Sequence, residues 1–106
     1  MDYEIGVEEL KSALDAGRPV SLLDVREPWE YQLARIEGSK LVPMNTIPAR
    51  LGELDRDVHT VVVCHHGGRS LSVAHWLRRQ GFDKVQSLRG GVDAWARVVD
   101  PKVPVY

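Results

Sequence analysis

One short segment, residues 64–70, holds most of the side chains that could do chemistry. It begins with Cys64, the only cysteine in the 106-residue chain, followed by two histidines, two glycines, an arginine and a serine. A cysteine thiolate is a strong nucleophile. Positive charge or amide donors beside the sulfur increase the fraction of the cysteine that is present as thiolate at neutral pH. The segment therefore predicts nucleophilic chemistry at Cys64. A redox cycle between two cysteines of this chain is excluded.

The glycines and the helix expected after them indicate how such a thiolate would be held. Adjacent glycines permit positive-φ conformations that point successive backbone N–H groups into one concavity. A helix starting near Ser70 would add the positive end of its dipole, and Arg69 a forked cation suited to an oxyanion. We expect an anion-binding cradle with Cys64 at its mouth. Its residues are His65, His66, Gly67, Gly68, Arg69 and Ser70.

Strands and helices alternate along the rest of the chain. Apolar and β-branched runs predict strands at residues 20–23, 41–42, 60–63 and 85–88. Helical spacing, glycine stops and prolines predict helical segments at residues 7–14, 28–33, 47–54, 70–80 and 92–98. This order predicts an α/β fold with a mostly parallel central sheet flanked on both faces by helices, in a single domain over residues 1–106.

Two polar strand ends suggest where a site would lie in that fold. Ligands of open α/β sheets bind beyond the carboxyl ends of the strands. Asp24 and Cys64 both follow apolar strands, so we expect them and Arg26 at one edge of the sheet. Asp24 and Arg26 are predicted as supporting residues. A structural ion pair and helix cap is the favoured role, and direct substrate contact is the alternative.

The histidines and arginines of the second half have less specific interpretations. His65 and His66 are not predicted to bind metal, because adjacent side chains are expected to diverge. They would line the loop mouth, where partial positive charge would attract an anionic donor, or face solvent. On the helix after the loop, Arg78 and Arg79 are expected to point outward.

Composition excludes several classes of protein. The net charge is −1, with −5 in residues 1–59 and +4 in residues 60–106, so no strongly basic face for nucleic acid is predicted. No apolar run is long enough to span a membrane, and the N-terminus does not resemble a secretory signal. A lone thiol suits a reducing compartment, so a cytoplasmic protein is expected.

Three segments together resemble one family. The pattern Cys64-x-x-Gly67-x-Arg69-Ser70 resembles the active-site loop of rhodaneses, while residues 24–43 and 90–95 resemble the family's first and closing signatures. The resemblance implies a sulfurtransferase that moves a sulfane sulfur from thiosulfate or a persulfide donor to a thiophilic acceptor. Cys64 would carry that sulfur as a persulfide, with no metal or organic cofactor.

Two other functions remain open. A cysteine-dependent phosphatase or arsenate reductase uses similar groups, but only four residues separate Cys64 from Arg69, one fewer than in the related phosphatases. A non-catalytic partner-docking module is the second alternative, and the intact loop argues against it.

The resemblance also implies partners. These are small anions such as thiosulfate, a cysteine-desulfurase persulfide as donor, and a ubiquitin-like sulfur-carrier protein as acceptor. The last is indicated by the tail of residues 100–106, which resembles that of rhodanese domains fused to adenylyltransferases. Alternatively, this tail packs back on the domain and covers a sheet edge.

Overall fold

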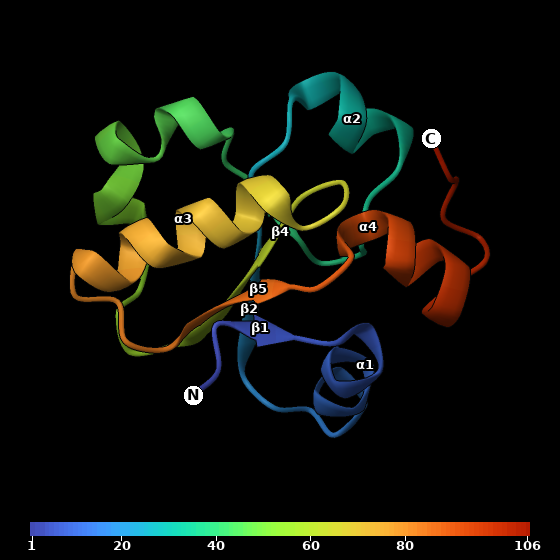
Figure 1. Ribbon diagram of the computed structural model, residues 1–106, viewed down its shortest axis with the longest axis horizontal. Helices are drawn as coiled ribbons and strands as arrows, with labels where there is room; N and C mark the ends of the chain where they lie inside the picture. The colour runs from blue at the N-terminus through green and yellow to red at the C-terminus, as the bar shows by residue number, and fades with distance from the viewer.

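The computed structural model describes residues 1–106, and a five-stranded sheet runs through its centre (Figure 1). The strand order is β1-β5-β4-β2-β3, and every pairing is parallel. The strands are β1 (Glu4–Ile5), β2 (Val20–Asp24), β3 (Lys40–Leu41), β4 (His59–Val63) and β5 (Val85–Leu88). The expected α/β class is confirmed. Strand β1 was not predicted, because two residues are too few to show a period.

Helices cover both faces of the sheet, as predicted (Figure 1). They are α1 (Val7–Asp15), α2 (Pro28–Leu33), α3 (Gly68–Arg79), α4 (Gly91–Ala94), the 3-10 helices η1 (Met44–Thr46) and η2 (Pro48–Glu53), and the π-helix η3 (Trp95–Val99). None of them is both long and apolar enough to cross a lipid bilayer.

Strand β4 supplies side chains to two separate hydrophobic cores, because successive residues of a strand point to opposite faces. Val61 and Val63 pack in the core beneath α1 and α4, whereas Val62 packs in the core beneath α3. Cys64 continues the second set and shares the α3 core. Its side chain therefore lies on the same face of the sheet as α3.

Three local features differ from the elements that the sequence predicted. Helix α3 begins at Gly68, two residues early, because Gly67 adopts a φ of 109° that turns the chain directly into the helix. The last predicted helix continues as a π-helix from Trp95. Arg78 does not simply point outward: it is half-buried and donates to the carbonyls of Val85 (2.9 Å) and Asp2 (2.7 Å), tying α3 to the N-terminal segment.

Candidate active site

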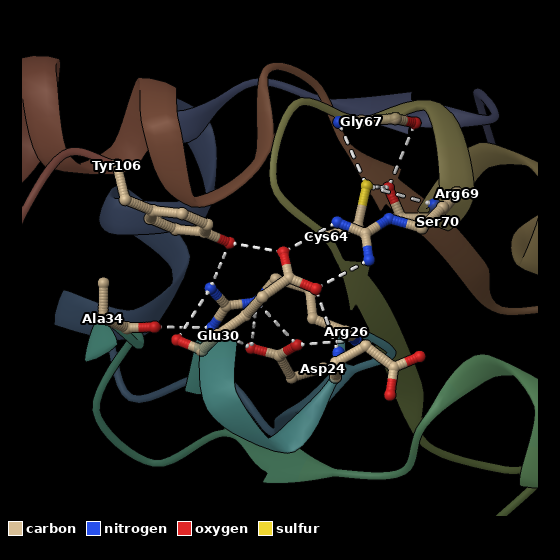
Figure 2. A network of polar contacts seen from close by, with 10 residues as sticks. Asp24, Arg26, Glu30, Ala34, Cys64, Gly67, Arg69, Ser70 and Tyr106 are labelled. Carbon is tan, nitrogen blue, oxygen red and sulfur yellow. Dashed lines mark hydrogen bonds and ion pairs between the residues drawn. The ribbon is translucent and has the colours of Figure 1, made fainter. Parts of the chain in front are cut away.

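The Cys64 side chain is enclosed by the loop that follows β4. Its Sγ accepts hydrogen bonds from the backbone N–H groups of Gly67 (3.1 Å) and Ser70 (3.3 Å), as Figure 2 shows. The predicted cradle thus has two amides directed at the sulfur. Cys64 is only 1% exposed, so it lies at the floor of the cradle. The sequence had predicted a position at the mouth of the cradle. The Cys64 backbone follows a buried strand, which carries the side chain into the α3 core.

Two buried serines extend the contacts of the sulfur. The Ser70 hydroxyl lies 3.3 Å from Sγ, where it accepts from the thiol, and donates to the Gly67 carbonyl at 3.1 Å. The Ser87 hydroxyl of β5 lies 2.7 Å from that of Ser70, and either can be the donor. Hydroxyl groups rotate to suit their partners. This pair can therefore accept from a thiol or donate to a thiolate.

Helix α4 supports the loop from behind. The N–H groups of Val92 and Asp93 donate to the carbonyls of Cys64 (2.9 Å) and His65 (3.1 Å). Gly91 lies so close that a Cβ there would overlap both carbonyl groups, and its φ is 59°. The Gly90-Gly91 pair thus allows the first turn of α4 to approach the loop, which fixes the backbone that carries Cys64.

Asp24 and Arg26 lie beside this loop, as their strand end predicted. Asp24 is in register with Val63, the residue before Cys64. Both Asp24 and Arg26 are fully buried, and the Arg26 guanidinium donates to the Asp24 carboxylate at 2.6 and 2.9 Å. Burial alone would lower the pKa of Arg26, but hydrogen bonds to Asp24 and Tyr106 outweigh it and raise the pKa.

Arg26 also ends helix α2. Its Nη2 donates to the carbonyl of Ala34, the C-cap residue, at 2.6 Å, and its Nη1 donates to the carbonyl of Glu30 at 3.3 Å. The Glu30 carbonyl also accepts from the Ala34 N–H, so Arg26 adds a second donor there and satisfies the Ala34 carbonyl at the C-terminal end of the helix. These contacts are those of an ion pair and helix cap. A substrate role for either residue stays a prediction.

Glu30 joins α2 to the Cys64 loop, a contact that was not predicted from the sequence. Its carboxylate accepts from both terminal nitrogens of Arg69, at 2.8 and 2.9 Å. The hydrogen bond from Arg69 outweighs burial and lowers the pKa of Glu30 to about 2, while Glu30 raises the pKa of Arg69. The forked end of Arg69, predicted to serve an anionic donor, is therefore directed to a carboxylate of the protein itself, and contact with a donor stays a prediction.

Tyr106 closes the same network. Its hydroxyl accepts from Arg26 Nη1 at 2.7 Å and donates to Glu30 at 2.8 Å (Figure 2). Burial is the main cause that raises the pKa of Tyr106 to about 12, so the hydroxyl keeps its proton near neutral pH. The tail does pack back on the domain, since Val103 and Tyr106 lie against the first core. Tyr106 also reaches the Cys64 loop.

The two loop histidines differ from their expected arrangement. Their rings do not diverge but lie 3.8 Å apart, and the His65 ring also stacks on Tyr106 at 3.8 Å. Burial, followed by the neighbouring His66, lowers the pKa of His65, which disfavours a positive charge on this ring. Asp93 lies within 4.8 Å of both rings, and its carboxylate accepts from Arg97 at 3.1 Å.

Local sequence patterns located the loop but not its distant partners. Glu30 had one available signal: Glu27 and Glu30 flank Pro28 and form a capping box, which places Glu30 in the first turn of α2. Ser87 looks like an ordinary residue of a buried strand. Tyr106 is separated from Arg26 by 80 residues, and no local pattern connects them.

Known proteins share this sequence and fold. Residues 6–98 match the rhodanese-like domain family. A sulfurtransferase from Allochromatium vinosum is 38% identical, with the alignment covering 92% of this chain and 91% of that protein. The chloroplastic rhodanese-like/PpiC domain-containing protein 12 of Arabidopsis thaliana is 39% identical over 97% of this chain, which spans only 37% of that protein.

A solved structure agrees with these matches. The crystal structure of a rhodanese-like domain protein from Staphylococcus aureus has a TM-score of 0.85 and 31% identity, covering 99% of both chains. The family match over residues 6–98 includes strands β2 to β5, the Cys64 loop and helix α4, which supports this loop from behind. The chain described here belongs to the rhodanese-like domain family.

Proposed function

We propose that this protein is a sulfurtransferase that carries a sulfane sulfur as a persulfide on Cys64. Relatives named sulfurtransferase support a sulfur-transfer role in general. The observation that carries the proposal is the pair of amides, from Gly67 and Ser70, directed at the only thiol of the chain. Such donors stabilise negative charge on sulfur, both in the thiolate and in the persulfide that replaces it.

The proposed reaction is a double displacement at sulfur. The Cys64 thiolate attacks the outer sulfur of thiosulfate or of a persulfide, and a new S–S bond forms at Sγ. The old S–S bond breaks, and its electron pair leaves with sulfite or with the donor thiolate. A thiophilic acceptor then attacks the outer sulfur of Cys64–S–SH and restores the thiolate. No net oxidation occurs in the cycle, and neither step needs a metal or organic cofactor.

The buried position of Cys64 restricts how a donor can approach. Because the residue is 1% exposed, a donor reaches Sγ only by inserting its outer sulfur into the loop. The remainder of the donor then lies at the rim of the Cys64 loop, which we define as the surface beside Arg69, whose side chain is 38% exposed. A donor with a terminal sulfur of low steric bulk, such as thiosulfate or a persulfide, suits this access.

Replacing Cys64 with alanine tests the proposal. Wild-type protein incubated with a sulfane donor, freed of it and analysed by intact mass spectrometry should gain the mass of one sulfur atom. Cys64→Ala should gain none and should lose thiosulfate:cyanide activity, with an unchanged circular dichroism spectrum as the folding control. A parallel assay with an aryl phosphate tests the phosphatase alternative. Undiminished sulfur transfer by Cys64→Ala, or phosphatase activity without sulfur loading, would contradict the assignment.

We further propose that a ubiquitin-like sulfur-carrier protein is an acceptor. One relative, from Mycobacterium tuberculosis, is named a probable adenylyltransferase/sulfurtransferase, MoeZ, and such a name joins carrier activation to sulfur transfer. The acceptor would receive the outer sulfur at its adenylated C-terminus as a thiocarboxylate. Persulfide-loaded protein, the carrier and its activating enzyme should yield that product by mass spectrometry. A yield no higher than with Cys64→Ala would reject this acceptor.

We also propose a cellular compartment and a domain organisation for the reaction. A sole thiol that must cycle between thiolate and persulfide needs a reducing compartment, which favours the cytoplasm. The Cys64 loop, α2, α4 and Tyr106 all contribute to one network, so residues 1–106 are proposed to act as a single domain.

A further inference from the structure

The charges around Cys64 cancel in pairs. Arg26 is paired with Asp24, and Arg69 is paired with Glu30 through two hydrogen bonds. Arg69 lies close enough to Cys64 for the thiolate to contribute to its raised pKa. Each of these two cations is therefore neutralised by a carboxylate of the protein.

The Arg69–Glu30 pair is held by further contacts. Glu30 is only 5% exposed in its side chain, and its carboxylate also accepts from the Glu27 backbone N–H at 3.0 Å and from the Tyr106 hydroxyl at 2.8 Å. Four hydrogen bonds thus fix the carboxylate opposite Arg69. The fold therefore holds the Arg69–Glu30 ion pair in place, and this pair keeps the rim neutral.

This neutrality matters because donors differ in charge where they meet the rim. When the outer sulfur of thiosulfate enters the loop, the sulfonate group lies beside Arg69, and the donor as a whole carries two negative charges. A protonated thiol persulfide, R–S–SH, has no charge at its S–S bond. A thiolate attacking a dianion experiences more repulsion than one attacking a neutral S–S bond, and uncompensated positive charge beside the donor would offset part of that difference.

Resting on the proposed sulfurtransferase activity, we infer that Glu30 is a specificity-determining residue that makes this site favour persulfides over thiosulfate as sulfur donors. The Cys64 thiolate attacks the terminal sulfur of R–S–SH, giving Cys64–S–SH and R–S⁻. The electron pair of the donor's S–S bond leaves with R–S⁻, and no other reactant is needed. Glu30 acts through Arg69 and does not contact the reacting atoms.

The test compares two donors that differ by one charge at the same kind of bond. Thiosulfate is a dianion and methanethiosulfonate a monoanion, and both donate the outer sulfur of a sulfur–sulfur bond. The ratio of their kcat/KM values is measured for wild type, Glu30→Gln and Glu53→Gln. Glu53 accepts two hydrogen bonds from Arg50 but lies with Ser21 and Thr60, near the amino ends of β2 and β4. It is therefore a matched control.

Glu30→Gln leaves Arg69 with uncompensated charge. The ratio should shift toward thiosulfate by roughly three- to tenfold, the size expected for one elementary charge several ångströms away at a protein surface. Glu53→Gln should not shift it. In the double variant Glu30→Gln/Arg69→Gln the rim is neutral again, and the ratio should return to within about twofold of wild type if the two effects are coupled through charge.

Each result has a distinct meaning. If wild type takes sulfur from neither donor nor from glutathione persulfide, the proposed function fails. If it loads sulfur but Glu30→Gln shifts the ratio no more than Glu53→Gln, only the specificity inference fails. Should Glu30→Gln not fold, the wild-type protein still provides a test. The thiosulfate rate should fall no more steeply with ionic strength than the methanethiosulfonate rate, and a selectively steep fall would overturn the inference.

Discussion

Glu30 and Glu53 each accept two hydrogen bonds from one arginine, with nearly equal distances of 2.8–2.9 Å, yet their surroundings differ. The Glu53 side chain is 44% exposed, and its partner Arg50 is three residues away in the chain. The Glu30 side chain is 5% exposed, and its partner Arg69 is 39 residues away. Geometry alone therefore does not set the contribution of such a pair. Solvent screens the first pair, whereas the second joins helix α2 to the Cys64 loop.

The fully buried Arg26–Asp24 pair extends this comparison and should give the largest effect. Arg26→Met leaves the Asp24 carboxylate buried without its partner, and loss of one member of a buried pair costs about 3–5 kcal/mol of unfolding free energy. Arg50→Met, in the solvent-exposed pair, should cost far less. Urea unfolding of both variants measures the difference. The double variant Arg26→Met/Asp24→Leu should recover part of the loss, and equal losses for Arg26→Met and Arg50→Met would refute the contrast.

The next largest difference between Glu30 and Glu53 should appear in how the unfolding free energy depends on acid pH. The pKa of Glu30 is lowered to about 2, chiefly by Arg69, from an ordinary value of 4.5. A lowered folded-state pKa contributes stability that is present above pH 4.5 and lost as the pH falls toward 2. For Glu30 this loss is about 2–3 kcal/mol. In Glu30→Gln the unfolding free energy should fall less across this range than in wild type.

Glu53→Gln is the control for the acid experiment. The pKa of Glu53 is also lowered to about 2, chiefly by Arg50, but this carboxylate is open to solvent. Its replacement should flatten the acid dependence much less than Glu30→Gln. Identical acid profiles for the two variants would show that burial does not distinguish these pairs.

The smallest effect is expected from exchanging the arginines for lysines. Arg69→Lys keeps the charge but loses the fork that contacts both Glu30 oxygens, so thiosulfate turnover should fall about tenfold, the size of one lost charge-assisted hydrogen bond. Because the rim stays neutral, the ratio between thiosulfate and methanethiosulfonate should not change. Arg50→Lys should alter neither quantity. Steady-state kinetics identical to wild type for Arg69→Lys would exclude a role for the fork.

The sequence alone was sufficient for features that depend on neighbouring residues. The β-branched run before Cys64 predicted a buried central strand, and the Gly67-Gly68 pair predicted the cradle that the amides of Gly67 and Ser70 form. The carboxyl-end rule for parallel strands brought Asp24 close to this loop. Each of these inferences uses a short pattern and one general property of sheets or turns.

Features that depend on side-chain packing between distant elements were not predictable in the same way. The burial of Cys64 depends on which face of β4 meets α3, and the lowered pKa of His65 depends on its burial and on the neighbouring His66. The pairing of Arg69 with Glu30 requires the distance between α2 and the start of α3. A single sequence gives no such distance.

The Tyr106 hydroxyl bond to Arg26 spans 80 residues, and this span has a consequence for biosynthesis. All five strands precede residue 89, and a chain is synthesised from its N-terminus, so every strand is made before Tyr106. During that interval Arg26 and Glu30 lack the hydroxyl that later joins them. The hydrogen bonds of this hydroxyl can therefore be added only after all the strands have been made, when the tyrosine docks between the two side chains.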